Sequence, residues 1–239
     1  MHAADLVAAW EQGSDRTPAG RGECLLDTVG IDPVRGCGLS VGQRDALLMD
    51  LHGRLFGTEV TALATCPACS ERLEVSFHLD DVRARPPGDP TDPVEVEVEG
   101  YTVRARPPTA GDLAALDTTA PWPDATRWLL ERCVLGARRD GREVAVGELP
   151  EVVRVRVEAR LAEADPQADV QVVLGCPGCG GTWGALFDIV SFLWQELDAR
   201  ARGLLVAVHD LASVYGWSEA DILAMSPHRR SLYLELVRR

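Results

Sequence analysis

The residues most suited to chemistry in this sequence are four cysteines in two matching turns. Cys66 and Cys69 enclose a Pro-Ala dipeptide, and Cys176 and Cys179 enclose Pro-Gly. Two cysteines separated by two residues in a tight turn can both face one ion, and a tetrahedral zinc ion accepts four thiolates. The two turns therefore predict one Zn²⁺ bound by Cys66, Cys69, Cys176 and Cys179.

We expect this zinc to be structural. Four thiolates complete the tetrahedral shell, whereas a catalytic zinc keeps one position for water or substrate. A single Cys-x-x-Cys motif would leave a redox site as a rival interpretation, but two matching turns favour a shared metal. Structural zinc contributes about 10–16 kcal/mol of apparent binding free energy. Its loss is therefore expected to unfold at least the segments around it.

The two cysteine segments form a weak internal repeat. Apolar side chains alternate with other residues after each turn, at Leu73, Val75, Phe77 and Leu79 and at Trp183, Ala185, Phe187 and Ile189. This period of two predicts a half-buried strand in each copy. One such strand cannot bury its apolar face alone, so we expect the copies to pair. The 106 residues between the two turns imply that residues 80–170 are inserted between the two halves.

The remaining cysteines and the histidines show no second motif. Cys24 and Cys37 lie among glycines and are interpreted as free thiols in a loop, with metal binding or a cross-link as the alternatives. Cys133 lies in an apolar helical stretch and is interpreted as a core residue. The five histidines share no spacing, and no Ser-His-Asp order, phosphate-binding glycine loop or pair of catalytic carboxylates stands out. We therefore expect no enzymatic activity and no small-molecule substrate.

The composition excludes several kinds of partner. The formal net charge is −13 and all 24 cationic side chains are arginine, scattered along the chain, which argues against nucleic-acid binding. No apolar run approaches the roughly 20 residues that span a bilayer, and the N-terminus lacks the basic region of a signal peptide. We therefore expect no membrane partner and a cytoplasmic location, where reduced cysteines favour metal binding over disulfides.

The first third of the chain has one clear helix and one clear hairpin. Residues 1–39 are rich in Gly, Pro and Asp and are expected to be irregular. Ser40 and Gln43 have the spacing of a capping box, and apolar residues at helical spacing follow, which predicts a helix over about 41–56. Residues 59–65 read as a strand that leads into the first cysteine turn and forms a hairpin with the strand after it.

The middle of the chain combines strands and helices. We expect a proline-rich linker at residues 86–93 and a hairpin formed by residues 94–98 and 101–106. A helix is expected to start at residue 109, and a further helix is expected over residues 122–135. Residues 150–164 fit both a strand alternation and a helical stripe. Pro150, which suits a first helical turn, and the Ala/Glu-rich run after it favour the helix.

The last third is expected to be helical. Apolar residues step by three and four over about 188–215 and predict a long amphipathic helix. Ser218 can cap a short helix, and Ser226-Pro227 starts another. Tyr215 and Trp217 are interpreted as packing at the helix junction.

The predicted fold class is α+β, with split zinc-ribbon-like hairpins. Residues 1–39 are an irregular N-terminal stretch, and residues 40–83 hold a helix with the first zinc hairpin. Residues 84–169 are an inserted α/β region, and residues 170–239 hold the second zinc hairpin with C-terminal helices.

Four features together carry a family resemblance: the two cysteine turns, the helix ALLMDLHGRLFG at 46–57, and the C-terminal run HDLASVYGWSEADILAM at 209–225 with RRSLYL at 229–234. In this order they resemble the baseplate or baseplate-hub assembly proteins of T-even-type phages, in the form found in gene clusters of extracellular contractile injection systems. The resemblance covers roughly residues 45–80 and 170–239.

The resemblance implies a non-enzymatic role in building the baseplate of a contractile phage-tail-like particle. The chain would be an assembly chaperone or a minor structural component, with other baseplate or hub proteins as partners and possible incorporation into the particle. Two rival functions differ in class. A zinc-ribbon adaptor of transcription or translation machinery needs a basic face, yet residues near both turns are neutral or acidic. A zinc hydrolase or deaminase needs a histidine or carboxylate ligand and an open position on the metal.

Overall fold

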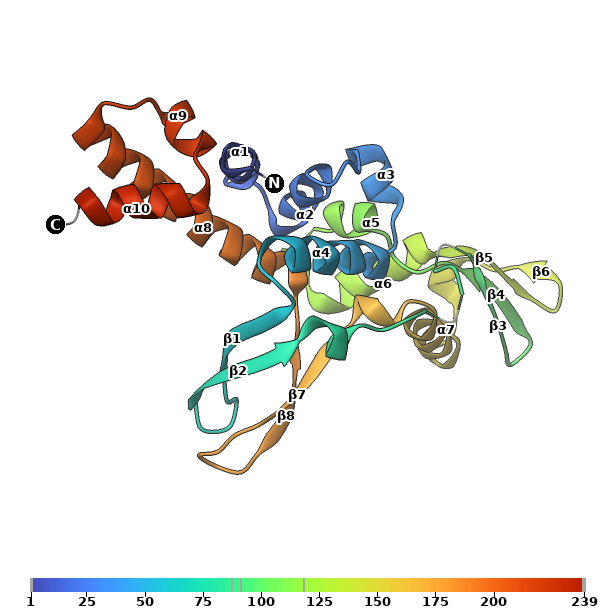
Figure 1. The fold of residues 1–239 in the computed structure, drawn as a ribbon. Coiled ribbons are helices and arrows are strands. Elements are labelled where there is room, and N and C mark those ends of the chain that lie inside the picture. Colours follow the sequence, from blue (N-terminus) through green and yellow to red (C-terminus); the bar gives the residue numbers. More distant parts are fainter. Residues whose placement is uncertain (1, 87, 91, 118, 238–239) are drawn as a thin grey trace.

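A computed structural model describes residues 2–86, 88–90, 92–117 and 119–237. Pro87 and Thr91 of the predicted linker, and the last two residues of the predicted segment 170–239, lie outside these ranges. Figure 1 shows a central helical body from which two β-hairpins project side by side. A sheet-containing unit lies at one end of the body and a helical lobe lies at the other.

The α-helices, in chain order, are α1 (Ala3–Gly13), α2 (Pro18–Asp27), α3 (Pro33–Gly38), α4 (Val41–Leu55), α5 (Ala110–Ala114), α6 (Trp122–Cys133), α7 (Glu151–Ala164), α8 (Ile189–Tyr215), α9 (Glu219–Ala224) and α10 (Pro227–Val237). The strands are β1 (Glu59–Thr65), β2 (Arg72–His78), β3 (Val94–Val98), β4 (Tyr101–Ala105), β5 (Val134–Arg139), β6 (Arg142–Glu143), β7 (Gln171–Gly175) and β8 (Thr182–Leu186). Short 3₁₀ turns are η1 (Leu79–Val82), η2 (Val146–Glu148) and η3 (Pro166–Ala168).

All the sheets are antiparallel. β1 pairs with β2 and β7 pairs with β8, which gives the two projecting hairpins, here called the hairpin arms. β3, β4, β5 and β6 form one sheet in sequence order. The mixed fold of helices and small antiparallel sheets, with a helical C-terminal part, agrees with the predicted class at this level. Among the described residues, no helix has both the length and the hydrophobicity that crossing a bilayer requires.

The helical body is built around α4 and α8. The buried stripe of α8 at Ile189, Leu193 and Leu197 packs with side chains of α1, α2 and α4 in one apolar cluster. The predicted capping box of α4 is present, since the Ser40 hydroxyl accepts from the Gln43 N–H and the Gln43 side chain accepts from the Ser40 N–H. This helix runs from Val41 to Leu55, within one residue of the prediction.

The predicted irregular segment at 1–39 is wrong, because α1, α2 and α3 occupy most of it. α2 and α3 both start with a cap followed by proline: Thr17 accepts from the Gly20 N–H, and Asp32 accepts from the N–H groups of Val34 and Arg35. Glycines in these helices cost about 1 kcal/mol each in intrinsic propensity, which hid the signal. Tertiary packing outweighs that cost.

The middle unit, defined as the β3–β6 sheet with α6 and α7, has its own apolar core. Val103 and Ala105 of β4 and Val153 and Val157 of α7 are fully buried in it. The predicted hairpin is present as β3 and β4, and the ambiguous stretch at 150–164 is helical as favoured, over Glu151–Ala164.

The predicted helix over 122–135 extends too far. α6 ends at Cys133, and the chain continues directly as β5, which pairs with β4. A β-branched residue such as Val134 fits a strand as well as a helix. The open edge of β4 decides between them, and local sequence does not show that edge.

The C-terminal lobe, made of the end of α8 with α9 and α10, follows the predicted helices closely. Gly216 ends α8 in the left-handed region at φ 66°, as glycine commonly does after a helix. The Tyr215 and Trp217 rings stack with centroids 4.5 Å apart, and Tyr233 of α10 meets both edge-on. These aromatics therefore pack the helix junction, as predicted.

Candidate metal centre

Each hairpin arm ends in a cysteine turn of the same backbone design. In the first turn, the Cys66 N–H donates to the Glu71 carbonyl and the Ser70 N–H donates to the Cys66 carbonyl. In the second, Cys176 makes the corresponding bonds with Gly181 and Gly180. Every partner is shifted by the same 110 positions, so the two turns are structural copies.

One backbone position in these turns needs left-handed geometry. It is held by Ser70 at φ 63° in the first turn and by Gly180 at φ 72° in the second. A non-glycine residue there costs about 1–2 kcal/mol. The first turn adopts this conformation despite that cost, so interactions beyond local backbone preference fix its shape.

The copies extend through the strands and into the body. Thr65 pairs with Arg72 as Gly175 pairs with Thr182, and the register is the same along both ladders. Phe77 and its equivalent Phe187 meet edge-on across the two arms, with ring centroids 5.1 Å apart. The weak sequence repeat is therefore a structural repeat with the two copies in contact.

The four sulfurs converge between the arms. The Sγ atoms of Cys66 and Cys179 are 3.7 Å apart and those of Cys69 and Cys176 are 3.5 Å apart. All four sulfurs lie within 4.8 Å of one another. A tetrahedron with Zn–S bonds of about 2.3 Å has S···S edges of about 3.8 Å. The separations thus fit one zinc ion and are far too long for disulfides.

Burial differs within each turn in the same way. Cys66 and Cys176 are buried, at 1% and 3% exposure, and Cys69 and Cys179 are exposed. Each sulfur pair across the arms therefore joins a buried cysteine of one turn to an exposed cysteine of the other. This pattern is the one that a two-fold relation between the turns produces.

The electrostatics of the cluster favour a thiolate at Cys66 and oppose one at Cys69. The backbone N–H groups of Cys69 and Ala68 point at the Cys66 sulfur and lower the pKa of that thiol to about 7. For Cys69, the backbone N–H of Glu71 acts in the same direction, but the neighbouring thiols of Cys176 and Cys66 outweigh it and raise the pKa to about 12. Four crowded thiols cannot all ionise without a cation, and a bound metal ion is the natural counter-charge.

The donor set is all sulfur. Within the described ranges, these four cysteines are the one group of three or more His, Cys, Asp or Glu residues placed to hold a metal. Soft thiolates select zinc among common structural ions, and four of them leave no position for a reacting water. The residues present therefore fit a structural zinc ion.

The other cysteines lie apart from the cluster and are free thiols. Cys24 and Cys37 are in helices α2 and α3, so their expected loop position is wrong. Cys24 is buried, and the Cys37 thiol donates to a carboxylate oxygen of Glu23 at 3.7 Å. Cys133 is buried in the core of the middle unit, as predicted, and burial raises the pKa of its thiol to about 11.

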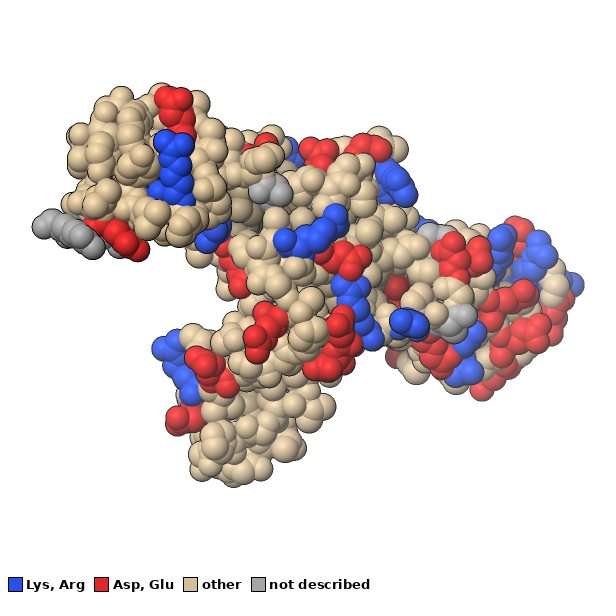
Figure 2. All heavy atoms as spheres, in the orientation of Figure 1, with Lys and Arg blue, Asp and Glu red and all other residues tan. Residues whose placement is uncertain are grey.

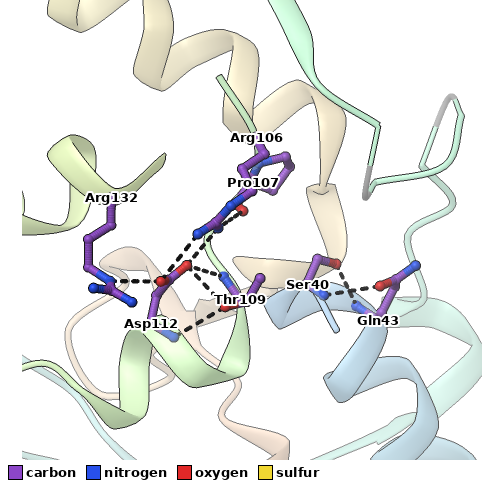
Figure 3. Close-up of polar contacts among 7 residues, drawn as sticks. All are labelled: Ser40, Gln43, Arg106, Pro107, Thr109, Asp112 and Arg132. Atoms are coloured by element: carbon purple, nitrogen blue, oxygen red, sulfur yellow. Dashed lines mark hydrogen bonds and ion pairs between the residues drawn. The ribbon is translucent and has the colours of Figure 1, made fainter. Parts of the chain in front are cut away.

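A second polar cluster, centred on buried Asp112, ties α5 to α6 and to the end of β4 (Figure 3). One carboxylate oxygen accepts from Arg106 Nη1 at 2.6 Å and from the Thr109 hydroxyl at 3.0 Å, and the other accepts from Arg132 Nε at 2.8 Å. Burial alone would raise the pKa of Asp112, but the bonds from Arg106, Thr109 and Arg132 outweigh it and hold the pKa well below its usual range.

Two further contacts involve the segment that follows α7. The Asp165 carboxylate accepts from the Gly42 N–H at the start of α4, at 2.9 Å. The side-chain oxygen of buried Gln167 accepts from the Ala84 N–H at 2.7 Å. Sequence reasoning found the helix start at Thr109 but missed these partners, because residues more than 80 positions apart give no local signal.

Most of the chain matches a known protein family. The model of the family described as "T4 bacteriophage base plate protein" matches residues 21–194. This chain belongs to that family. Neither a curated protein nor a solved structure matches the chain at a significant level of similarity.

The family match includes both cysteine turns and all of the middle unit. It thus spans residues 81–169, where no motif supported the resemblance, and stops inside α8 before the C-terminal run at 209–234. The family is the one that the sequence indicated. The helix at 46–57 and the two cysteine turns lie within the match, and the C-terminal run lies outside it. Membership points to a structural component of a phage baseplate that interacts with other baseplate proteins.

Proposed function

We propose that this chain is a non-enzymatic, zinc-stabilised assembly factor or minor structural component of the baseplate of a contractile phage-tail-like particle. Membership of the base plate family supports the particle, and the convergence of four thiols supports the zinc. The family match carries the baseplate role, and the closed sulfur set favours scaffolding over catalysis. Other baseplate or hub proteins are the proposed partners.

The zinc acts by holding the arms together. Its four ligands come from two segments whose nearest members, Cys69 and Cys176, are more than 100 positions apart in the chain. In the loop-entropy description, closing a loop of about 100 residues restricts the unfolded chain by about 4–5 kcal/mol. Beyond the sulfurs, Phe77 and Phe187 provide an apolar contact between the arms. Both arms are then held in a fixed orientation relative to the body.

The charge distribution supports protein partners over nucleic acid. The hairpin arms, residues 59–78 and 171–186, contain three glutamates and one arginine. In Figure 2 the lower part of the arms is largely uncharged, and acidic and basic side chains are mixed over the end of the molecule that holds the β3–β6 sheet. The net charge of −13 disfavours a phosphate backbone as the partner.

The experiment that tests the function uses the particle-producing strain. Deleting the gene is expected to leave particles absent or without baseplates, as seen by electron microscopy, and reintroducing the gene restores them. Intact, contractile particles in the deletion strain would refute the proposal. Probing purified wild-type particles for this chain then separates a structural component, which is present, from an assembly factor, which is absent.

A further inference from the structure

The middle unit has an open apolar groove between α6 and α7. Its floor contains Leu129 and Leu130 of α6 and Leu161 of α7, and two prolines, Pro108 and Pro166, line its ends. Both helices contribute to the core of the unit, so the groove is an extension of that core to the surface. An exposed apolar groove of this kind marks an interaction site more often than a packing defect.

The apolar stripe continues outward on α6. Trp122, at the first position of this helix, is 81% exposed. It lies four residues before Thr126, which lines the groove, and residues four apart share a face of a helix. Tryptophan is enriched among residues that anchor protein interfaces. A partner lying in the groove would therefore cover Trp122 as well.

The rim of the groove is acidic and lacks cations. Two exposed carboxylates line it, Glu158 on α7 and Asp169 after η3, and the third lining carboxylate, Asp165, is buried. Asp165 accepts from the Gly42 N–H and Asp169 accepts from the Gln171 amide. In the part of the chain that the structure describes, none of the three forms an ion pair.

The arginines of α6 do not line the groove, and both form ion pairs. Arg127 of α6 pairs with Asp124, and Arg132 pairs with Asp112. The groove therefore presents apolar floor and unneutralised negative charge together. This combination is complementary to an apolar surface flanked by basic side chains, and it disfavours anionic ligands such as nucleic acid or acidic lipid headgroups.

We propose that this groove binds an amphipathic helix of another protein, with apolar side chains facing Leu129 and Leu161 and with Lys or Arg beside Glu158 and Asp169. Two helices that border an open groove accept a third helix through its residues at i, i+3, i+4 and i+7. The proposal deepens the proposed function, and so rests on it, by naming a surface and the kind of partner segment that it takes. The peptide test below involves neither the metal nor the particle, so the two can fail separately.

The test uses purified full-length protein and two fluorescein-labelled synthetic peptides of about 18 residues, long enough for about five helical turns. Both carry leucine at i, i+3, i+4 and i+7; one has lysine at the other positions and the other has glutamate. Fluorescence anisotropy measures binding. The lysine peptide is expected to bind and the glutamate peptide is not. No binding by the lysine peptide, or equal binding by both, overturns the proposal.

Two matched pairs of variants place the binding site. Glu158→Lys and Ala162→Arg change exposed residues that line the groove, and each is expected to raise the dissociation constant about tenfold or more. Glu163→Lys and Ala159→Arg make the same changes at exposed positions of α7 that do not line the groove. They alter the total charge equally, so an equal loss of binding in both pairs would show non-specific attraction and overturn the proposal.

Trp122→Ala provides a variant that cannot act through the core, because the side chain is already exposed. It is expected to weaken peptide binding about tenfold while leaving the melting temperature unchanged. Sedimentation of the protein alone tests a second copy as the occupant. Self-association that Ala162→Arg abolishes and Ala159→Arg preserves would assign the groove to a homo-oligomer and overturn the proposal.

Discussion

The hairpin arms and the middle unit are both small antiparallel sheets, yet different interactions hold them. The middle unit buries the side chains of Val103, Val153 and Val157 completely between its sheet and α7. The arms are two-stranded, and the buried apolar side chains of their strands are Val60, near the body, and Leu174, beside the second cysteine turn. Isolated two-stranded hairpins are marginally stable in water. Where the middle unit has an apolar core, the arms have four converging thiols.

With the proposed zinc ion bound, the chain has two sources of stability. An apolar core is formed by many weak contacts, and losing one of them costs part of the stability. A metal centre depends on four ligands acting together, so losing one ligand removes most of the effect. The contact of Asp165 with Gly42 joins the middle region, residues 84–169, to the start of α4 by a hydrogen bond. Substitutions in the arms, in the middle unit and at this joint should therefore have distinct effects on stability.

The largest effect is expected from Cys176→Ser. Removing one sulfur leaves three donors, so zinc content measured by mass spectrometry should fall from one ion per chain to near zero. The arms should lose hydrogen-exchange protection. The free energy of unfolding should fall by several kcal/mol, because a filled structural zinc site contributes about 10–16 kcal/mol of apparent binding free energy. Cys37→Ser, which removes a free thiol outside the cluster, should keep its zinc. Full zinc occupancy in Cys176→Ser would rule out the ligand set.

The next largest effect is expected from Leu149→Ala in the core of the middle unit. This side chain is 2% exposed, and truncating a buried leucine costs about 2–5 kcal/mol. Denaturant unfolding should show the loss, and hydrogen exchange should locate it in β3–β5 and α7. The zinc content should stay at one ion per chain. Release of zinc by this variant would mean that arms and middle unit are not separate in stability.

Gly42→Ala tests the joint between the middle region and the body. A Cβ at this position would lie 2.0 Å from the Asp165 Oδ1 and 3.0 Å from a backbone nitrogen, so the carboxylate must leave the start of α4. The expected cost is about 1–3 kcal/mol. Gly53→Ala is the matched control in the same helix, where the nearest atom would be 3.5 Å away.

In Gly53→Ala the ordinary helix preference for alanine should raise the stability by about 0.5–1 kcal/mol. Opposite signs for the two glycine variants are therefore expected in thermal unfolding. An increase in stability in both would show that the contact between Asp165 and α4 contributes nothing.

The smallest effect is expected from Asp112→Asn, about 1–2 kcal/mol near neutral pH. The value is modest because Arg106 and Arg132 are partly exposed to solvent. The pKa of Asp112 is lowered in the folded protein, so its stabilisation is present above the unfolded pKa of about 3.9 and declines as the pH falls below it.

The difference in unfolding free energy between wild type and Asp112→Asn should therefore shrink below about pH 4. The comparison is made on metal-free protein, because acid also releases zinc from thiolates. A difference that stays constant down to pH 3 would show that the charge of Asp112 is not the source of its effect.

Local sequence was sufficient for elements whose signals are short-range. The capping box at Ser40, the alternation around each cysteine turn and the apolar stripe from Ile189 each predict an element that the structure contains. Where the prediction was wrong, the deciding contact is distant. The glycines of α2 favour a loop by local sequence, but Gly22 packs near Val190 and Arg44. Val134 fits a helix by local sequence, but it pairs with β4 in the sheet.

The sequence by itself determined the two pairs of cysteines, because a Cys-Pro-x-Cys turn places two sulfurs on one side whatever surrounds it. It also determined the repeat, and with it the expectation that the two copies meet. Only the tertiary structure decided which sulfur of one turn lies nearest to which sulfur of the other, and that the buried member of each turn meets the exposed member of its partner. That choice depends on how α4 and α8 set the bases of the arms, and spacing along the chain carries no information about such an angle.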